Sequence, residues 1–195
     1  MKHLLLVVIS SAVVNNVVLV RQVGLCPLLQ GSGSLKRMLR LGLVITAVMT
    51  VGVMACGMLN TWVLGPLRLF SVMTLADALV ILMLSRLATW MAVRTGWFRS
   101  GLSKLEDMMF SAQCVALAVI LMAAAGQYPV GWPGLVFGAG SGLGWTMVAV
   151  VFETIRRRLD EAPVPSSMRG LPIYLVAFGL LALVGMGLAG VAGIE

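Results

Sequence analysis

The sequence is poor in charge. Only 11% of its 195 residues are Asp, Glu, Lys or Arg, and only 7 of these are acidic, whereas soluble domains carry about 25% charged residues. Hydrophobic residues make up 60% of the chain, and no polar stretch is long enough to form a separate soluble domain. The composition therefore excludes a water-soluble catalytic domain and predicts one integral membrane domain over residues 1–195.

Metal-ligating residues are also scarce, because the chain has one histidine, His3, and three cysteines. Cys56 lies within an uncharged apolar run and is expected to be a small buried apolar residue. Cys26 and Cys114 occupy corresponding places in the two halves of the chain. The residues alone allow them to be inert core thiols, a disulfide, or two soft ligands of a metal centre. An iron–sulfur cluster usually needs four cysteines, so ligation would require a second chain.

In place of charge, the chain has apolar runs close to the roughly 20 residues that cross a bilayer. Short breaks that contain Gly, Pro, Ser and charge separate them. We expect the first run to be a retained span and not a cleaved signal peptide, because no clear cleavage pattern follows it. The six predicted spans are Leu4–Val20, Leu41–Leu64, Leu69–Val93, Leu105–Ala125, Pro133–Phe152 and Leu171–Val191.

Basic residues lie mainly on one side of these spans. Lys2 and Arg68 fall on the other side, and Arg86 lies within the third span. Because basic loops stay in the cytoplasm, we expect a bacterial inner-membrane protein with both termini in the periplasm or exterior. This placement explains the net charge of +7 without nucleic-acid binding. The remaining basic residues, all after the first, third and fifth spans, are Arg21, Lys36, Arg37, Arg40, Arg94, Arg99, Lys104, Arg156, Arg157, Arg158 and Arg169.

The two halves of the chain, residues 1–97 and 98–195, have the same layout of three spans each. An odd number of spans makes the second half enter the membrane from the opposite side, so we expect an all-α fold with a 3+3 inverted repeat. Such folds place functional groups on interrupted helices near the midplane. Gly24 and Pro27 flank Cys26 and predict a broken helix there. Nothing equally disruptive flanks Cys114, so a break in the second half has less support.

Several segments resemble the RnfA/NqrE family, whose members are membrane subunits of Rnf-type complexes and of the sodium-translocating NADH:quinone reductase. The resemblance covers the whole chain, and its first block is the most specific. The matching segments are Val14–Val20, Val23–Leu29, Asn60–Leu67, Ile155–Leu159, Val164-Pro165 and Arg169-Gly170.

The resemblance implies a membrane subunit of an ion-motive ferredoxin:NAD+ oxidoreductase, coupled to Na+ or H+ at the level of the complex. Cys26 and Cys114 match the two ligands by which such a subunit shares a 2Fe–2S cluster with a homologous RnfE subunit of opposite orientation. This cluster would relay electrons across the bilayer. By the same resemblance, flavins would be bound only by partner subunits. The resemblance also implies RnfB, RnfC, RnfD and RnfG partners in the surrounding lipid. Asn15 and Asn16 would line the cluster site or bond the backbone near the break.

The approach to Cys114 departs from the family pattern. The family usually has an uncharged, proline-containing stretch that ends in Thr-Asn-Cys, whereas this chain has Glu106 and Asp107 and ends in Ala112-Gln113-Cys114. The thiol is retained, but the local helix break is left in doubt. The acidic pair is expected to favour a helix N-terminus through the helix dipole.

Glycines in the fifth span are spaced for helix packing. Gly138 and Gly142, and likewise Gly140 and Gly144, lie four residues apart, which is the spacing of close helix contacts in membranes. A dinucleotide-binding loop does not fit, because the last glycine of that motif is missing and no strand precedes it. We therefore interpret these glycines as packing residues.

Four charged residues lie within or beside the spans. Glu153 and Arg157 are one turn apart at the cytoplasmic end of the fifth span and are predicted to form a solvated ion pair. Asp77 and Arg86 lie within the third span, where charge is costly, and nine residues place them on opposite faces of a helix. Asp77 is therefore expected at a subunit contact or the interface, or in an ion path.

Two rival functions remain open at this stage. One is a small inverted-repeat ion or solute transporter in which the cysteines are incidental. The other is a cluster-free scaffolding subunit that holds partners through its glycine faces.

Overall fold

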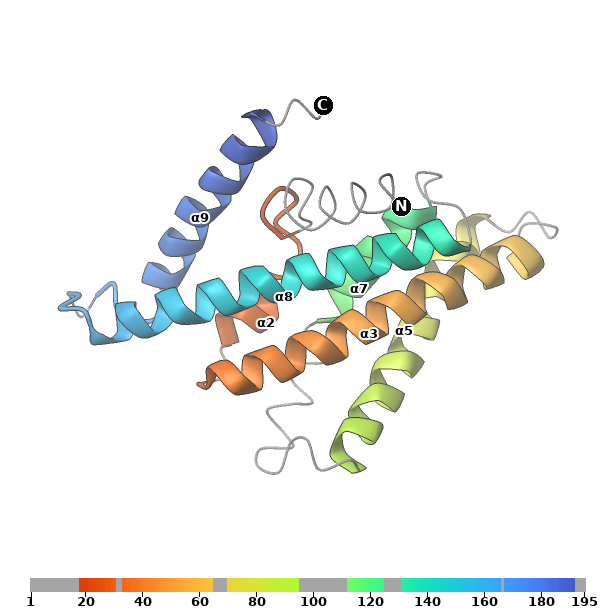
Figure 1. The fold of residues 1–195 in the computed structure, drawn as a ribbon, viewed down its shortest axis with the longest axis horizontal. Coiled ribbons are helices and arrows are strands. Elements are labelled where there is room, and N and C mark those ends of the chain that lie inside the picture. The colour runs from red at the N-terminus through yellow and green to blue at the C-terminus, as the bar shows by residue number, and fades with distance from the viewer. Residues whose placement is uncertain are drawn as a thin grey trace.

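The computed structural model describes residues 18–30, 33–64, 70–94, 112–124, 131–165 and 167–191. Every regular element in these ranges is helical, as predicted. Three helices are long and apolar enough to cross a membrane, at Leu35–Trp62, Met73–Arg94 and Trp132–Glu161. The elements in order are α2 (Leu25–Gln30), α3 (Leu35–Leu59), the π-helix η2 (Asn60–Leu64), α5 (Phe70–Arg94), α7 (Gln113–Met122), α8 (Trp132–Glu161) and α9 (Leu171–Val191) (Figure 1).

The predicted spans agree with these helices where both can be compared. The third and sixth spans coincide with α5 and α9 to within a residue. α3 begins at Leu35, before the apolar run, and α8 continues to Glu161, because basic residues extend a helix without adding hydropathy. The first span lies outside the described residues except for a turn at residues 18–20, and so do residues 105–111 of the fourth. The count of six therefore stays a prediction.

The centre of the molecule is the helix pair α3 and α8, which lie side by side and run antiparallel (Figure 1). α5 and α7 pack against α3, whereas α9 contacts α8 and α2. α3 and α8 correspond to the second spans of the two predicted halves. Their antiparallel relation is the one that an inverted repeat requires.

A symmetric pair of Gly-x-x-x-Thr segments forms the closest part of this contact. Gly42 of α3 packs on Thr146 of α8, and Gly142 of α8 packs on Thr46 of α3. Each threonine donates to the carbonyl of the glycine one turn earlier on its own helix, at 2.8 Å, and the two threonine Oγ1 atoms lie 3.3 Å apart. Of the glycines predicted to serve packing, Gly138 and Gly142 contact α3 closely, and the Gly-x-x-x-Thr contact has matching halves.

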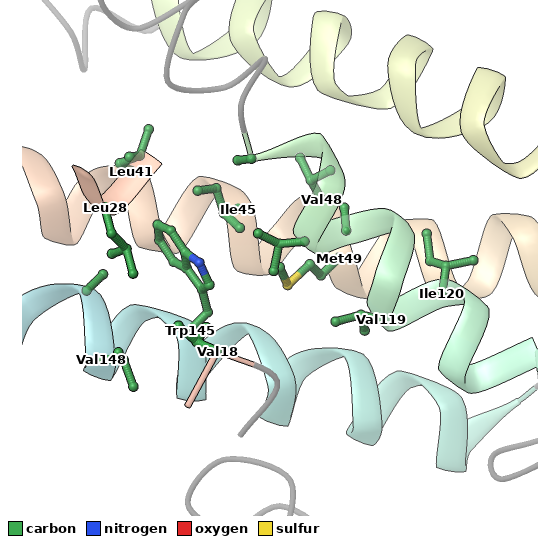
Figure 2. Packing of buried hydrophobic residues seen from close by; sticks show 14 of the residues in the cluster. Val18, Leu28, Leu41, Ile45, Val48, Met49, Val119, Ile120, Trp145 and Val148 are labelled. Carbon is green, nitrogen blue, oxygen red and sulfur yellow. The ribbon is translucent and has the colours of Figure 1, made fainter. Parts of the chain in front are cut away.

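A buried apolar cluster holds the shorter helices on this pair. Trp145 of α8 is 1% exposed and belongs to the same cluster as Leu28 of α2 and Val119 of α7 (Figure 2). Many large apolar side chains on the outer faces are exposed, among them Trp62 and Met83, as expected of a surface that meets lipid or other subunits. The core thereby fixes α2 and α7, the helices that carry Cys26 and Cys114.

The prediction of a solvated Glu153–Arg157 pair is wrong for the acidic partner. Glu153 is only 2% exposed, and its Oε1 lies 4.0 Å from the Nε of Arg157, whose side chain is half exposed. The helix α8 continues well beyond Glu153, so this turn is packed inside the molecule instead of marking its end. Sequence position at the end of an apolar run does not report this burial.

Candidate functional site

The chain is interrupted directly before Cys26. Gln22 and Gly24 both have positive φ, at 54° and 90°, and α2 begins at Leu25, so that Cys26 is its second residue. Pro27 fits here because the first turn of a helix needs no backbone N–H from it. This agrees with the break predicted from Gly24 and Pro27.

Cys114 has the corresponding position in the second half, as the second residue of α7. The backbone N–H groups of Cys114 itself and of Val115 lie near its sulfur. The side chain of Gln113 donates to the Oγ of Ser85 at 3.0 Å, which ties the start of α7 to α5. Residues 105–111, including Glu106 and Asp107, lie outside the described residues, so the break predicted there stays a prediction.

The fold brings the two thiols together. The side chains of Cys26 and Cys114 lie close enough to interact with each other, and both residues are exposed on the single chain. Gly24 makes the approach possible because a Cβ at this position would collide with Val115, next to Cys114. Two sulfur atoms therefore meet at one place on the molecular surface.

The donor set at this place is of the kind that binds soft metal centres. Thiolates are the usual ligands of iron–sulfur clusters. Within the described residues no group of three or more His, Cys, Asp or Glu side chains gathers to hold a metal. Cys26 and Cys114 thus fit half of a four-cysteine site, with their exposed sides open to a partner.

Cys56 is placed apart from the two other cysteines, as predicted. It is fully buried in the core, and its sulfur lies 4.0 Å from the backbone carbonyl of Asp77. None of the three cysteines, all of which the structure describes, forms a disulfide. Asn15 and Asn16 lie outside the described residues, so their expected role stays a prediction.

Arg156 supports the helix that carries Cys26, a role that sequence reasoning missed. Its guanidinium donates to the carbonyl of Leu29 at 3.1 Å, at the C-terminal end of α2, and lies 4.5 Å from the ring centre of Tyr174. Tyr174 in turn donates its hydroxyl to Asp160. The sequence offers one indication of this role, because Arg156 lies in the family-like segment Ile155–Leu159. That resemblance does not predict its contact with Leu29.

Asp77 and Arg86 lie on opposite faces of α5, as predicted. Asp77 is fully buried and faces α3, where its Oδ2 accepts a hydrogen bond of 3.2 Å from the side-chain amide of Asn60. Arg86 is exposed. The acidic group is therefore an internal feature and not an interfacial one.

Comparison with known proteins agrees with these observations. A family model described as "Rnf-Nqr subunit, membrane protein" matches residues 4–194. The chain is 35% identical to the A-type subunit of the ion-translocating oxidoreductase complex from Syntrophotalea carbinolica, over 97% of this chain and 98% of that protein. It is 36% identical to the corresponding subunit from Aromatoleum aromaticum, over 95% of both chains, and 33% identical to that from Escherichia coli, over 97% and 98%. The chain belongs to the Rnf-Nqr family of membrane subunits.

Proposed function

We propose that this chain is the A-type membrane subunit of an Rnf-type ion-motive ferredoxin:NAD+ oxidoreductase of the bacterial inner membrane. The relatives named above are subunits of ion-translocating oxidoreductase complexes, so a chain of this family is expected to work in a complex. Coupling to Na+ or H+ would then be a property of that complex. RnfB-, RnfC-, RnfD- and RnfG-like subunits would be the other partners.

Within this complex, Cys26 and Cys114 would supply two of the four thiolates of a 2Fe–2S cluster. A homologous RnfE-like subunit of opposite orientation would supply the other two. The observation that carries the proposal is the meeting of these two thiols, while the third cysteine is buried elsewhere. Neither rival function, a transporter or a scaffold, requires two cysteines from different halves of the chain to meet.

When bound, such a cluster would accept and release single electrons within the bilayer. This chain would supply the polar and apolar groups that surround the cluster. The backbone N–H groups of Cys114 and Val115 lie near the Cys114 sulfur and would be donors to it in a bound cluster. The apolar cluster around Trp145 excludes water from the inner side of the site, and exclusion of water and hydrogen bonds to sulfur both tune the reduction potential of such a centre.

Substitution of single cysteines in the purified complex tests this function. Cys26→Ser and Cys114→Ser should each abolish the electron paramagnetic resonance signal of a reducible 2Fe–2S cluster and lower the iron content, because serine does not replace a soft thiolate ligand. Cys56→Ser is the matched control and should keep both the signal and the iron. A full signal in either the Cys26 or the Cys114 variant would refute the proposal.

A further inference from the structure

A second polar site lies inside the helices, away from the paired cysteines. Asp77 of α5 is 0% exposed and Asn60, at the start of η2, is 9% exposed. The amide Nδ2 of Asn60 donates to Asp77 Oδ2. Cys56, one turn before Asn60, has its sulfur next to the backbone carbonyl of Asp77. These contacts join the C-terminal end of α3 to the first third of α5.

Two oxygen atoms of this site have no hydrogen-bond partner in the part of the chain that the structure describes. They are Oδ1 of Asp77 and Oδ1 of Asn60, and both are buried. Among the described residues a salt bridge joins Arg157 to Glu153, and it does not involve Asp77. Both oxygens are acceptors, so they cannot satisfy each other. Among the described residues, the site has the Cys56 thiol beside Asp77 but no ion-pair partner for the carboxylate.

The backbone is also irregular at this point. α3 ends at Leu59 and continues as the π-helix Asn60–Leu64, and short π-helical turns within α-helices are frequent at functional sites. The wider turn begins at the residue whose side chain contacts Asp77. The buried carboxyl group thus lies against the π-helical segment Asn60–Leu64.

We propose that Asp77 and Asn60 form an intramembrane site for one monovalent cation, either H+ or Na+. A single carboxylate calls for a single positive charge, because a charge left uncompensated in a membrane-buried site is unfavourable. A proton on Asp77 would convert its carboxylate into a donor for the oxygen of Asn60. Sodium would instead use both oxygens as ligands, and carboxylate and amide oxygens suit hard cations. The site does not use Cys26 or Cys114 and stands independently of the proposed cluster.

Thermal unfolding of the purified full chain in detergent tests this proposal. A ligand that binds only the folded state raises the unfolding midpoint with its concentration. The midpoint of the wild-type chain should therefore rise with NaCl but not with an equal concentration of choline chloride if the cation is Na+. It should rise only as the pH falls if the cation is H+.

Asp77→Asn removes the charge but preserves the size of the side chain and should abolish whichever response the wild type has. Glu153→Gln changes the other buried carboxyl group of the described residues and should keep the wild-type response. Asn60→Ala should raise the cation concentration for half-maximal stabilisation about tenfold, because it removes one oxygen ligand. Equal responses in the wild type and in Asp77→Asn to both Na+ and pH would overturn the proposal.

Labelling provides a second readout that does not depend on stability. Dicyclohexylcarbodiimide reacts with protonated carboxyl groups in apolar surroundings, and peptide mass spectrometry locates the product. We expect modification of Asp77 in the wild type, with protection by NaCl but not by choline chloride if Na+ is the ligand. Modification that falls only as the pH rises would identify H+. This test uses the single chain and leaves the cysteines unchanged. Its failure would therefore count against the cation site alone, whereas the cysteine variants of the complex test the cluster alone.

Discussion

At the scale of single residues, Gly24 joins the two cysteine segments. It has a φ of 90°, a region that residues with a side chain rarely adopt, and it packs directly on Val115. The indole nitrogen of Trp145 lies 3.2 Å from where its Cβ would be. The position therefore needs glycine both for its backbone conformation and for its contact with the second half of the chain.

Gly24→Ala is expected to disturb the cysteine site. The backbone conformation alone should cost about 1–2 kcal/mol of unfolding free energy, and the collision with Val115 a further ~1–3 kcal/mol. Denaturant unfolding of the chain and the iron content of the complex measure the two effects. Gly170→Ala is the matched control, because Gly170 has a φ of 95° with nothing within 4 Å. It should show only the backbone cost and keep its iron, so equal losses in the two variants would contradict this account.

The residues of the site differ in how far sequence predicts them. Cys26 and Cys114 are identifiable because a thiol in an apolar chain is rare and their segments resemble a family. Arg156 is interpretable from sequence only as a basic topology signal, because its contact with Leu29 joins residues 127 positions apart. The prediction of a solvated Glu153 fails for a similar reason. Burial of a charged side chain depends on neighbours that no local pattern contains.

At the scale of elements, the contact of α3 with α8 organises the molecule. Both helices present a glycine to the threonine of the other, and both threonines bond back to their own helix. In lipid the hydrophobic effect does little to hold helices together, so close backbone approach and interhelical polar contacts matter more. The shorter helices α2 and α7 pack on this pair. The contact of α3 with α8 therefore determines where both cysteines lie.

Gly142→Ala should weaken this helix pair. A Cβ at Gly142 would lie 2.7 Å from the Cα of Thr46, and because that atom belongs to the backbone the helices must move apart. We expect a loss of about 1–3 kcal/mol in unfolding free energy, measured by denaturant titration in detergent. Gly179→Ala on α9 has nothing within 4 Å of its Cβ, and it should be at least as stable as the wild type because alanine favours helix. A Gly142 variant of wild-type stability would show that the contact is not tight.

Sequence predicts which elements exist better than where they end. Hydropathy reports the part of a helix that lies in lipid, so it identifies α5 and α9 closely. It misses the polar extensions of α3 and α8, where helical hydrogen bonding continues past the apolar run. The glycine spacing predicts a packing face on α8, but the matching Gly42–Thr46 face on α3 is evident only when the two helices are seen together.

At the scale of the whole molecule, orientation in the membrane is the property on which the proposed relay depends, because the proposed partner of opposite orientation would have to meet the paired cysteines. Basic residues concentrate after the first, third and fifth spans, and α8 carries Arg156, Arg157 and Arg158 in its last turns. Each basic residue that crossed the membrane would oppose insertion, so this bias predicts that the C-terminal end of α8 lies in the cytoplasm. The sixth span is then predicted to return the chain, so Glu195 is expected outside the cytoplasm.

Reporter fusions at two positions on either side of α9 test this orientation in cells. Alkaline phosphatase, which is active only outside the cytoplasm, should be active when fused after Glu195 and inactive when fused after Pro165. A green fluorescent protein, which matures only in the cytoplasm, should give the opposite pattern at the same two positions. The two sites flank one helix and serve as controls for each other, since misfolding would silence both reporters at one site instead of exchanging them. Phosphatase activity after Pro165 together with fluorescence after Glu195 would reverse the orientation inferred from charge and require the partner subunit to enter the membrane from the other side.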